Sequence, residues 1–68
     1  MISYEPLWRT MDKMNATTYT LQAKGGVSSS TIRRMKAGHS VSTNTLDALC
    51  NLLKCKLHDV AEYIPDKK

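Results

Sequence analysis

Two adjacent glycines, Gly25 and Gly26, interrupt a helical pattern of apolar residues that otherwise extends from residue 18 to residue 38. Glycine loses more conformational freedom than other residues in a helix and is the usual residue of tight turns, so we expect the helix to break here. The stretch therefore predicts two short helices joined by a glycine turn. The apolar positions on either side of the break are Leu21, Val27, Ile32 and Met35.

The second of these helices has two different faces. Successive helical residues turn by about 100°, so Ile32 and Met35 share one face, while most of the polar and small residues point roughly the other way. Short serine side chains let a helix approach a surface closely, and two adjacent guanidinium groups match phosphate or the acceptor edge of guanine. This face predicts a recognition helix for a DNA major groove; its residues are Ser30, Arg33, Arg34 and Ala37.

The pattern resembles the helix-turn-helix of the lambda-repressor-like, Cro/CI-type regulators. The residues that carry the resemblance are TLQAKGGVSSSTIRRMKAG, and it continues through SVSTNTLDALCNLLKCKLHDVAEYI, so that it covers about residues 7–64. The resemblance implies an all-α, compact five-helix DNA-binding domain with the helix-turn-helix at its second and third helices. We expect one domain over residues 1–65 and a frayed tail over residues 66–68.

The resemblance also implies which residues contact DNA. In this family the third helix reads base edges, and the start of the second helix and the loop after the third lie against phosphates. The residues expected to read bases are Ser29, Ser30, Arg33 and Arg34. Those expected at phosphates are Thr17, Thr18, Ser28, Thr31, Lys36, His39 and Ser40. For Thr17 and Thr18, helix capping alone is the alternative role, and Ser28 is also the expected cap of the third helix.

The excess positive charge is concentrated in the same stretch. The formal net charge is +4, and the four basic residues between positions 24 and 40 are accompanied by no Asp or Glu. The rest of the chain holds six basic and six acidic residues, so it is neutral. Such a distribution is typical of a nucleic-acid-binding surface, with a simple solvated basic face as the alternative.

Outside this motif the pattern predicts three more helices. The first runs from about Pro6 to Met14, with an apolar stripe that includes Tyr4, Leu7 and Trp8. The fourth is capped by Ser42 and carries Leu46, Leu49, Cys50 and Leu53. A short fifth helix carries Leu57, Val60, Ala61 and Ile64 and stops at Pro65. We expect no strand pair of useful length, and we expect Gly25 to add flexibility at the end of the second helix.

A chain of 68 residues has room for one small core, with a stability of only about 3–5 kcal/mol. We find no nucleophile–base pair, no paired carboxylates and no phosphate-binding loop, so the sequence does not indicate an enzyme. Cys50 and Cys55 lack partners at metal-ligand spacing, so no metal, cofactor or small-molecule ligand is expected. No secretory signal or apolar stretch of about 20 residues is present, which favours a reduced, cytoplasmic setting without a membrane partner.

These observations favour a sequence-specific transcription regulator that binds double-stranded DNA, with repression the expected outcome. The resemblance implies that it binds as a homodimer. The predicted dimer contact is the fifth helix and the tail, with Tyr63 and Ile64, which lie away from the recognition helix in this family. The alternative is a protein-interaction module, such as an antitoxin or a phage-type regulatory partner, on the same scaffold. RNA binding is disfavoured because Trp8 and the tyrosines fall mainly on core stripes.

Overall fold

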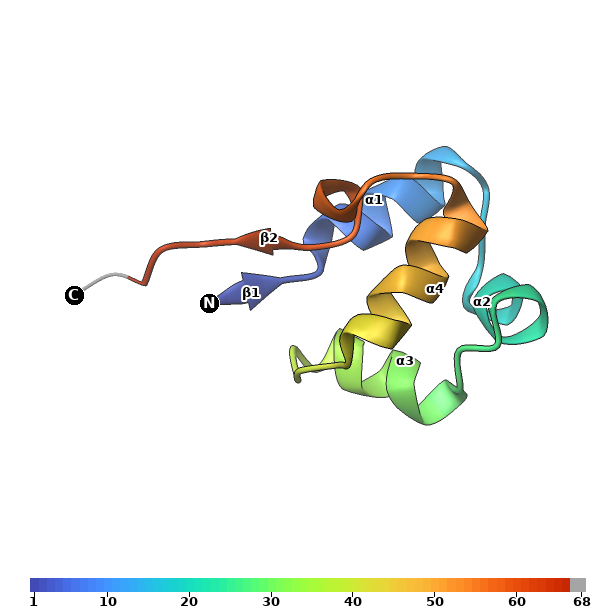
Figure 1. Cartoon of the computed structure of the whole chain (residues 1–68), viewed down its shortest axis with the longest axis horizontal. Coiled ribbons are helices and arrows are strands. Elements are labelled where there is room, and N and C mark those ends of the chain that lie inside the picture. The colour runs from blue at the N-terminus through green and yellow to red at the C-terminus, as the bar shows by residue number, and fades with distance from the viewer. Residues whose placement is uncertain (67–68) are drawn as a thin grey trace.

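The computed structural model describes residues 1–66 and places four α-helices around one core (Figure 1). These are α1 (Glu5–Lys13), α2 (Thr18–Gly25), α3 (Ser29–Lys36) and α4 (Thr43–Leu53). A single 3-10 turn, η1 (Leu57–Asp59), follows them, and two short strands, β1 (Ile2–Ser3) and β2 (Glu62–Tyr63), pair at one end. The all-α class is confirmed, with four α-helices in place of the five expected.

Hydroxyl side chains determine where three of the helices begin. Thr17 Oγ1 accepts the backbone N–H of Thr20 at 3.3 Å, and Ser28 Oγ accepts that of Thr31 at 3.2 Å. Ser42 Oγ likewise accepts the N–H of Thr45 at 3.3 Å. Each bond satisfies a donor that the first helical turn leaves without a partner. The predicted starts of the second, third and fourth helices are confirmed.

The two glycines have different roles. Gly26 adopts the left-handed conformation, with φ of 68°, and ends α2. Gly25 is the last residue of α2, and a Cβ atom there would lie only 2.8 Å from Leu52 Cδ2 of α4. The flexibility expected at Gly25 stays a prediction, and the structure adds a second role, because the missing side chain leaves room for Leu52 of α4.

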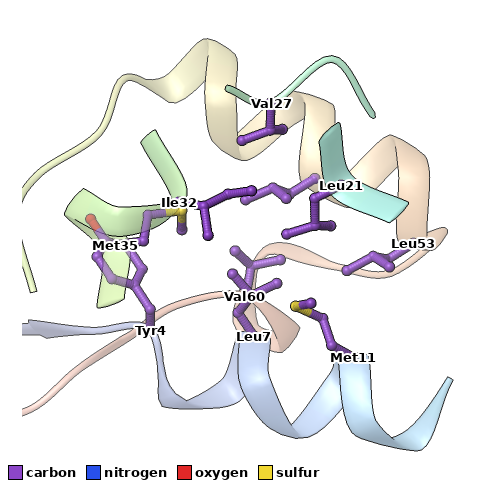
Figure 2. Packing of buried hydrophobic residues seen from close by; sticks show 10 residues of the cluster. Tyr4, Leu7, Met11, Leu21, Val27, Ile32, Met35, Leu53 and Val60 are labelled. Atoms are coloured by element: carbon purple, nitrogen blue, oxygen red, sulfur yellow. The ribbon is translucent and has the colours of Figure 1, made fainter. Parts of the chain in front are cut away.

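The core is formed by ten buried side chains drawn from every helix (Figure 2). Ile32 and Met35 of α3 point into it and are 4% and 2% exposed. Leu7 of α1, Leu21 of α2 and Leu49 of α4 are completely buried. Trp8 packs against this cluster, as expected for a core anchor. The inward face predicted for the recognition helix is confirmed.

The expected fifth helix is wrong. The Val60 N–H donates to the Leu57 carbonyl at 2.9 Å and closes one 3-10 turn, and Asp59 Oδ2 accepts the Lys56 N–H at 3.0 Å at its start. The chain then enters the strand β2 at Glu62. Val60 is fully buried, but Leu57 and Ile64 are exposed, so this segment has no continuous apolar helical face. One buried side chain is enough to anchor a turn against the core, and it does not sustain a helix.

Two strands of two residues each pair at one end, where no strand pair of useful length was expected. Ile2 lies opposite Tyr63 and Ser3 opposite Glu62 in an antiparallel pair. Met1 and Ile64 extend this pair by exchanging main-chain hydrogen bonds of 2.7 and 2.8 Å. The pairing joins residues about sixty positions apart. Main-chain N–H and C=O groups of the two chain ends hydrogen-bond to each other and not to water.

Two tyrosines contradict the expectation that the aromatic side chains belong to the core. Tyr4 is 7% exposed, whereas Tyr19 and Tyr63 are 75% and 66% exposed.

At the C-terminal end of the described chain, Asp66 belongs to the predicted frayed tail, yet its Oδ1 atom lies 3.2 Å from the N-terminal ammonium. Residues 67 and 68 of that tail lie outside the described residues. No helix within residues 1–66 has the length and apolar character needed to span a membrane.

Replacing Ile32 by alanine tests the orientation of α3. Because Ile32 is buried in the core, we expect the free energy of unfolding to fall by roughly 2–5 kcal/mol. Chemical denaturation followed by circular dichroism measures it. Met14→Ala is the control, since Met14 is 49% exposed and its truncation should change stability little. An unchanged midpoint in Ile32→Ala would show that α3 is turned the other way.

Candidate nucleic-acid interface

The outward face of α3 is exposed and polar. Ser29, Ser30, Arg33 and Arg34 are all exposed, while the residues between and after them, Ile32 and Met35, are buried. The apolar face of α3 is buried in the core, so the opposite face, which carries the serines and arginines, is turned to solvent. The structure thus brings the four expected base-reading residues onto one helix surface.

The loop that follows α3 is held in place by two side chains from different parts of the chain. The Tyr4 hydroxyl donates to the carbonyl oxygen of His39 at 3.0 Å, and Arg34 Nη2 donates to that of Ser40 at 3.3 Å. Tyr4 is itself part of the core. The expected phosphate contacts His39 and Ser40 therefore lie on a loop that is tied to both the core and α3.

Arg34 differs from Arg33 because of this contact. Its guanidinium group lines an open cavity of about 350 Å³ between α3 and the start of α4. One of its N–H groups is directed to Ser40, and the planar group has further donors for a second acceptor. The other residues that line the cavity are Thr31, Ser40, Val41, Ser42 and Thr45.

Hydroxyl groups gather at the start of α3. Ser28 Oγ lies 3.1 Å from Ser30 Oγ and 2.9 Å from Thr31 Oγ1, in addition to accepting the Thr31 N–H. Thr17 forms a similar pair with Thr20 at the start of α2. The expected phosphate residues Thr17 and Ser28 are thus helix caps, and each keeps a hydroxyl at a helix end where backbone N–H groups favour anions.

The expected phosphate residues are accessible to different degrees. Thr17, Ser28, Lys36, His39 and Ser40 are exposed, whereas Thr18 and Thr31 are half-buried. They lie at the starts of α2 and α3, at the end of α3 and in the loop that follows. All seven therefore lie in the helix-turn-helix or in the loop that follows it, and five of them are open to solvent.

The positive charge of this region has no acidic partner among the described residues. The ion pairs within residues 1–66 join the N-terminal ammonium to Asp66, Arg9 to Glu62 and His58 to Asp59. None of them involves Lys24, Arg33, Arg34 or Lys36. Positive charge that is not neutralised by the protein itself is available to attract phosphates.

The two cysteines lie together at the end of α4, away from α3. The Cys55 N–H donates to the Cys50 carbonyl at 3.1 Å, and both thiols are free and half-buried. Burial, followed by the neighbouring Cys50, raises the pKa of the Cys55 thiol. A raised pKa favours the protonated form, which is a poor nucleophile and a poor metal ligand. Within residues 1–66, no three His, Cys, Asp or Glu side chains gather as a metal site requires.

Comparison with protein families now connects this geometry to known proteins. The family model described as the Cro/C1-type HTH DNA-binding domain matches this chain over residues 6–66. The chain belongs to the Cro/C1-type helix-turn-helix family. The match includes α1 from Pro6 onward and the whole of α2, α3, α4 and β2, so it covers the helix-turn-helix and every core residue except Tyr4.

A solved structure is similar to this chain in fold and, to a lesser degree, in sequence. The crystal structure of the transcriptional regulator VanUg, Form II, has a TM-score of 0.87 to this chain and is 31% identical to it. The alignment covers 96% of this chain and 87% of that one. A comparison with curated protein sequences gave no match.

Sequence reasoning missed the role of Tyr4 beside the interface. Its place on the apolar stripe of α1 predicts burial, but the stripe does not reveal the distant partner of its hydroxyl. A buried tyrosine hydroxyl usually needs a hydrogen-bond acceptor, so the expected burial of Tyr4 already indicated that some acceptor lies beside it. The identity of that acceptor, the His39 carbonyl, depends on the tertiary structure.

Replacing Ser28 by alanine tests whether this hydroxyl caps α3. We expect Ser28→Ala to lower the free energy of unfolding by about 1 kcal/mol, because the Thr31 N–H loses its acceptor. Ser29→Ala is the matched control, since Ser29 is exposed and lies one residue inside the helix. Thermal unfolding without DNA measures both; equal losses in the two variants would contradict the cap.

Proposed function

We propose that the chain is a sequence-specific regulator of transcription that inserts α3 into the major groove of double-stranded DNA. The observation that carries the proposal is the pair Arg33 and Arg34, exposed and without acidic partners among the described residues, on a helix whose other side is locked into the core. The similarity to VanUg, a transcriptional regulator, supports it.

In this proposal two groups of residues have different tasks. Ser29, Ser30, Arg33 and Arg34 read base edges, and the arginines supply most of the discrimination, because a bidentate arginine–guanine pair favours the right base by about 1–3 kcal/mol. The residues that hold the DNA backbone and set the register of α3 are Thr17, Thr18, Ser28, Thr31, Lys36, His39 and Ser40.

Arg34 already has one hydrogen-bond partner in the free protein. Its Nη2 donates to the Ser40 carbonyl in the free protein, so a bidentate contact with guanine either uses its remaining donors or replaces this bond. Holding the guanidinium near the groove before DNA arrives would reduce the entropy lost on binding. Arg33 has no such bond among the described residues and would enter the interface less ordered.

We further propose that the protein acts as a homodimer and represses transcription by occupying its operator. One subunit offers a recognition helix of eight residues and few contacts, so two subunits are needed for tight binding. A two-fold dimer would read half-sites about 34–36 Å apart, one turn of DNA. A cytoplasmic location and the absence of enzymatic activity are further parts of this proposal.

The two arginines can be tested on an operator selected from a random duplex library. We expect Arg34→Ala and Arg33→Ala each to weaken operator binding by about 1–3 kcal/mol and to relax specificity at one base pair. Fluorescence anisotropy with the operator and with base-substituted operators measures both the affinity and the specificity. Arg9→Ala is the control, because it removes the same charge from α1, where Arg9 faces Glu62 at 3.8 Å.

Different results would separate the possible roles. A loss in Arg34→Ala that is equal for every operator variant would make Arg34 a phosphate contact. Failure of the folded wild-type protein to bind any 30-bp duplex at low salt would overturn DNA binding, and the protein-interaction module would become the better hypothesis.

Lys36 tests the phosphate contacts. We expect Lys36→Ala to lower the affinity for all duplexes alike and to reduce the slope of log K against log salt by about one unit, because one phosphate contact is lost. A salt series with random and operator duplexes measures the slope. Lys13→Ala, at the exposed end of α1, should leave it unchanged. A loss confined to the operator would mean that Lys36 reads a base.

A further inference from the structure

The end of α4 brings the two cysteines together. Lys54 ends the helix in the left-handed conformation, with φ of 51°, and the Cys55 N–H then turns back to the Cys50 carbonyl at 3.1 Å. In this type of helix ending, the two residues that the bond joins usually bring apolar side chains into contact. Here both side chains are free thiols, so the contact joins two groups that can be oxidised.

The separation of the two residues suits a disulfide bond. Standard bond lengths and the hydrogen bond of 3.1 Å limit the distance between the two Cα atoms to about 7 Å. Disulfides join Cα atoms about 4.4–6.8 Å apart, and a larger separation requires the backbone to move. The Cys55 thiol also hydrogen-bonds with the Cys50 thiol, so the two side chains point toward each other.

The core holds both thiols in place. Cys50 and Cys55 are half-buried and pack against the buried cluster. Two groups that are already ordered side by side lose little freedom when they are joined, whereas the unfolded chain must first close the loop between them. The fold therefore raises the effective concentration at which each thiol meets the other.

One of the two thiols is open to a reagent from outside. Cys55 lines an open cavity of about 520 Å³ beside the end of α1 and η1, and Cys50 is not among the described residues around it. One carboxylate at this cavity, that of Asp59, lies 3.7 Å from His58. The ion pairs within residues 1–66 leave out three lysines that also line the cavity, Lys13, Lys54 and Lys56. This excess of positive charge favours an anionic reagent.

The surroundings of Cys55 govern the rate of its reaction. Burial, followed by the neighbouring Cys50 and Asp59, raises the pKa of the Cys55 thiol. Only the thiolate attacks a disulfide, so the reaction is slow at neutral pH and becomes faster as the pH rises. The amount of disulfide at equilibrium depends instead on how closely the fold holds the two sulfur atoms.

We propose that Cys50 and Cys55 form a redox site that reacts with a small anionic disulfide of the glutathione type and closes to an intramolecular disulfide. The Cys55 thiolate attacks one sulfur of the reagent, the S–S bond of the reagent breaks, and one reagent thiolate leaves. The Cys50 thiolate then attacks the Cys55 sulfur of this mixed disulfide and releases the second reagent thiolate. The two leaving thiolates take up the two protons lost by the cysteines, so the protein is oxidised by two electrons and the reagent is reduced by two.

The redox site is separate from the proposed DNA interface. Figure 1 shows the start of α4 beside α3 and the end of α4 away from it. The inference therefore does not rest on the proposed function, and it is measured without DNA. Because folding and oxidation are linked in one thermodynamic cycle, a disulfide that forms more readily in the folded chain stabilises the fold by the same factor.

A redox titration with glutathione tests the proposal. The protein is equilibrated above neutral pH at a fixed concentration of reduced glutathione and increasing oxidised glutathione, and acid and an alkylating reagent then trap the free thiols. Intact mass distinguishes the internal disulfide, which is two hydrogen atoms lighter and carries no alkyl group, from alkylated thiols and glutathione adducts. We expect half-oxidation of the folded protein at roughly tenfold or more lower oxidised glutathione than the same chain requires in denaturing urea.

Variants with one thiol, or with one thiol displaced, are the matched controls. Cys50→Ser and Cys55→Ser should form only the mixed disulfide with glutathione. Cys50→Ser should form it faster, because it keeps the thiol that lines the cavity. A double variant, Cys55→Ser with Lys56→Cys, keeps two thiols but places one of them beyond the closed turn. We expect it to require roughly tenfold more oxidised glutathione than the wild type.

Two results would contradict the redox site. One is an equal requirement for oxidised glutathione in the folded and the unfolded wild-type chain, because the fold would then contribute nothing to the pairing. The other is a folded wild type that carries glutathione on its cysteines without any internal disulfide. Faster glutathione addition to Cys55→Ser than to Cys50→Ser would reverse the assigned order of attack. A failure to bind DNA would contradict the proposed function and leave this titration unchanged.

Discussion

The insertion of Ile32 and Met35 into the core is the contact on which the rest of the structure depends. These two side chains, 4% and 2% exposed, fix the rotation of α3 about its axis. The outward serines and arginines are exposed, and the hydrogen bonds of Ser30 with Ser28 and of Arg34 with Ser40 lie at the surface. In so small a domain one cluster of buried residues both stabilises the fold and aims the functional face, so the two properties cannot be varied independently.

Around this core, several groups combine a structural role with a place in the proposed DNA interface. Thr17 and Ser28 cap helices and place hydroxyls at helix ends that attract anions. Tyr4 fills the core and fixes the carbonyl of His39, and Arg34 holds that of Ser40. The helix starts and the loop after α3 are consequently ordered before any partner binds, which lowers the entropic cost of binding.

The distribution of charge and apolar surface divides the molecule into two ends. The helix-turn-helix carries positive charge that no acidic side chain neutralises within the described residues, while the ends of the chain form internal ion pairs around exposed apolar side chains. Coulombic attraction favours phosphates at the first end, and burial of apolar area favours a protein surface at the second. The two ends meet at the loop that follows α3.

Features that depend on neighbouring residues were determined by the sequence itself. The caps Thr17, Ser28 and Ser42, the break at Gly26 and the inward face of Ile32 and Met35 all follow from local periodicity and turn chemistry. The family resemblance added the candidate DNA contacts, of which the structure shows the position and not the role. The tertiary structure alone decided the strand pair, the single turn of η1, the exposure of Tyr63 and the close approach of Gly25 to Leu52. Each of these depends on contacts between distant parts of the chain, whose formation a local pattern does not encode.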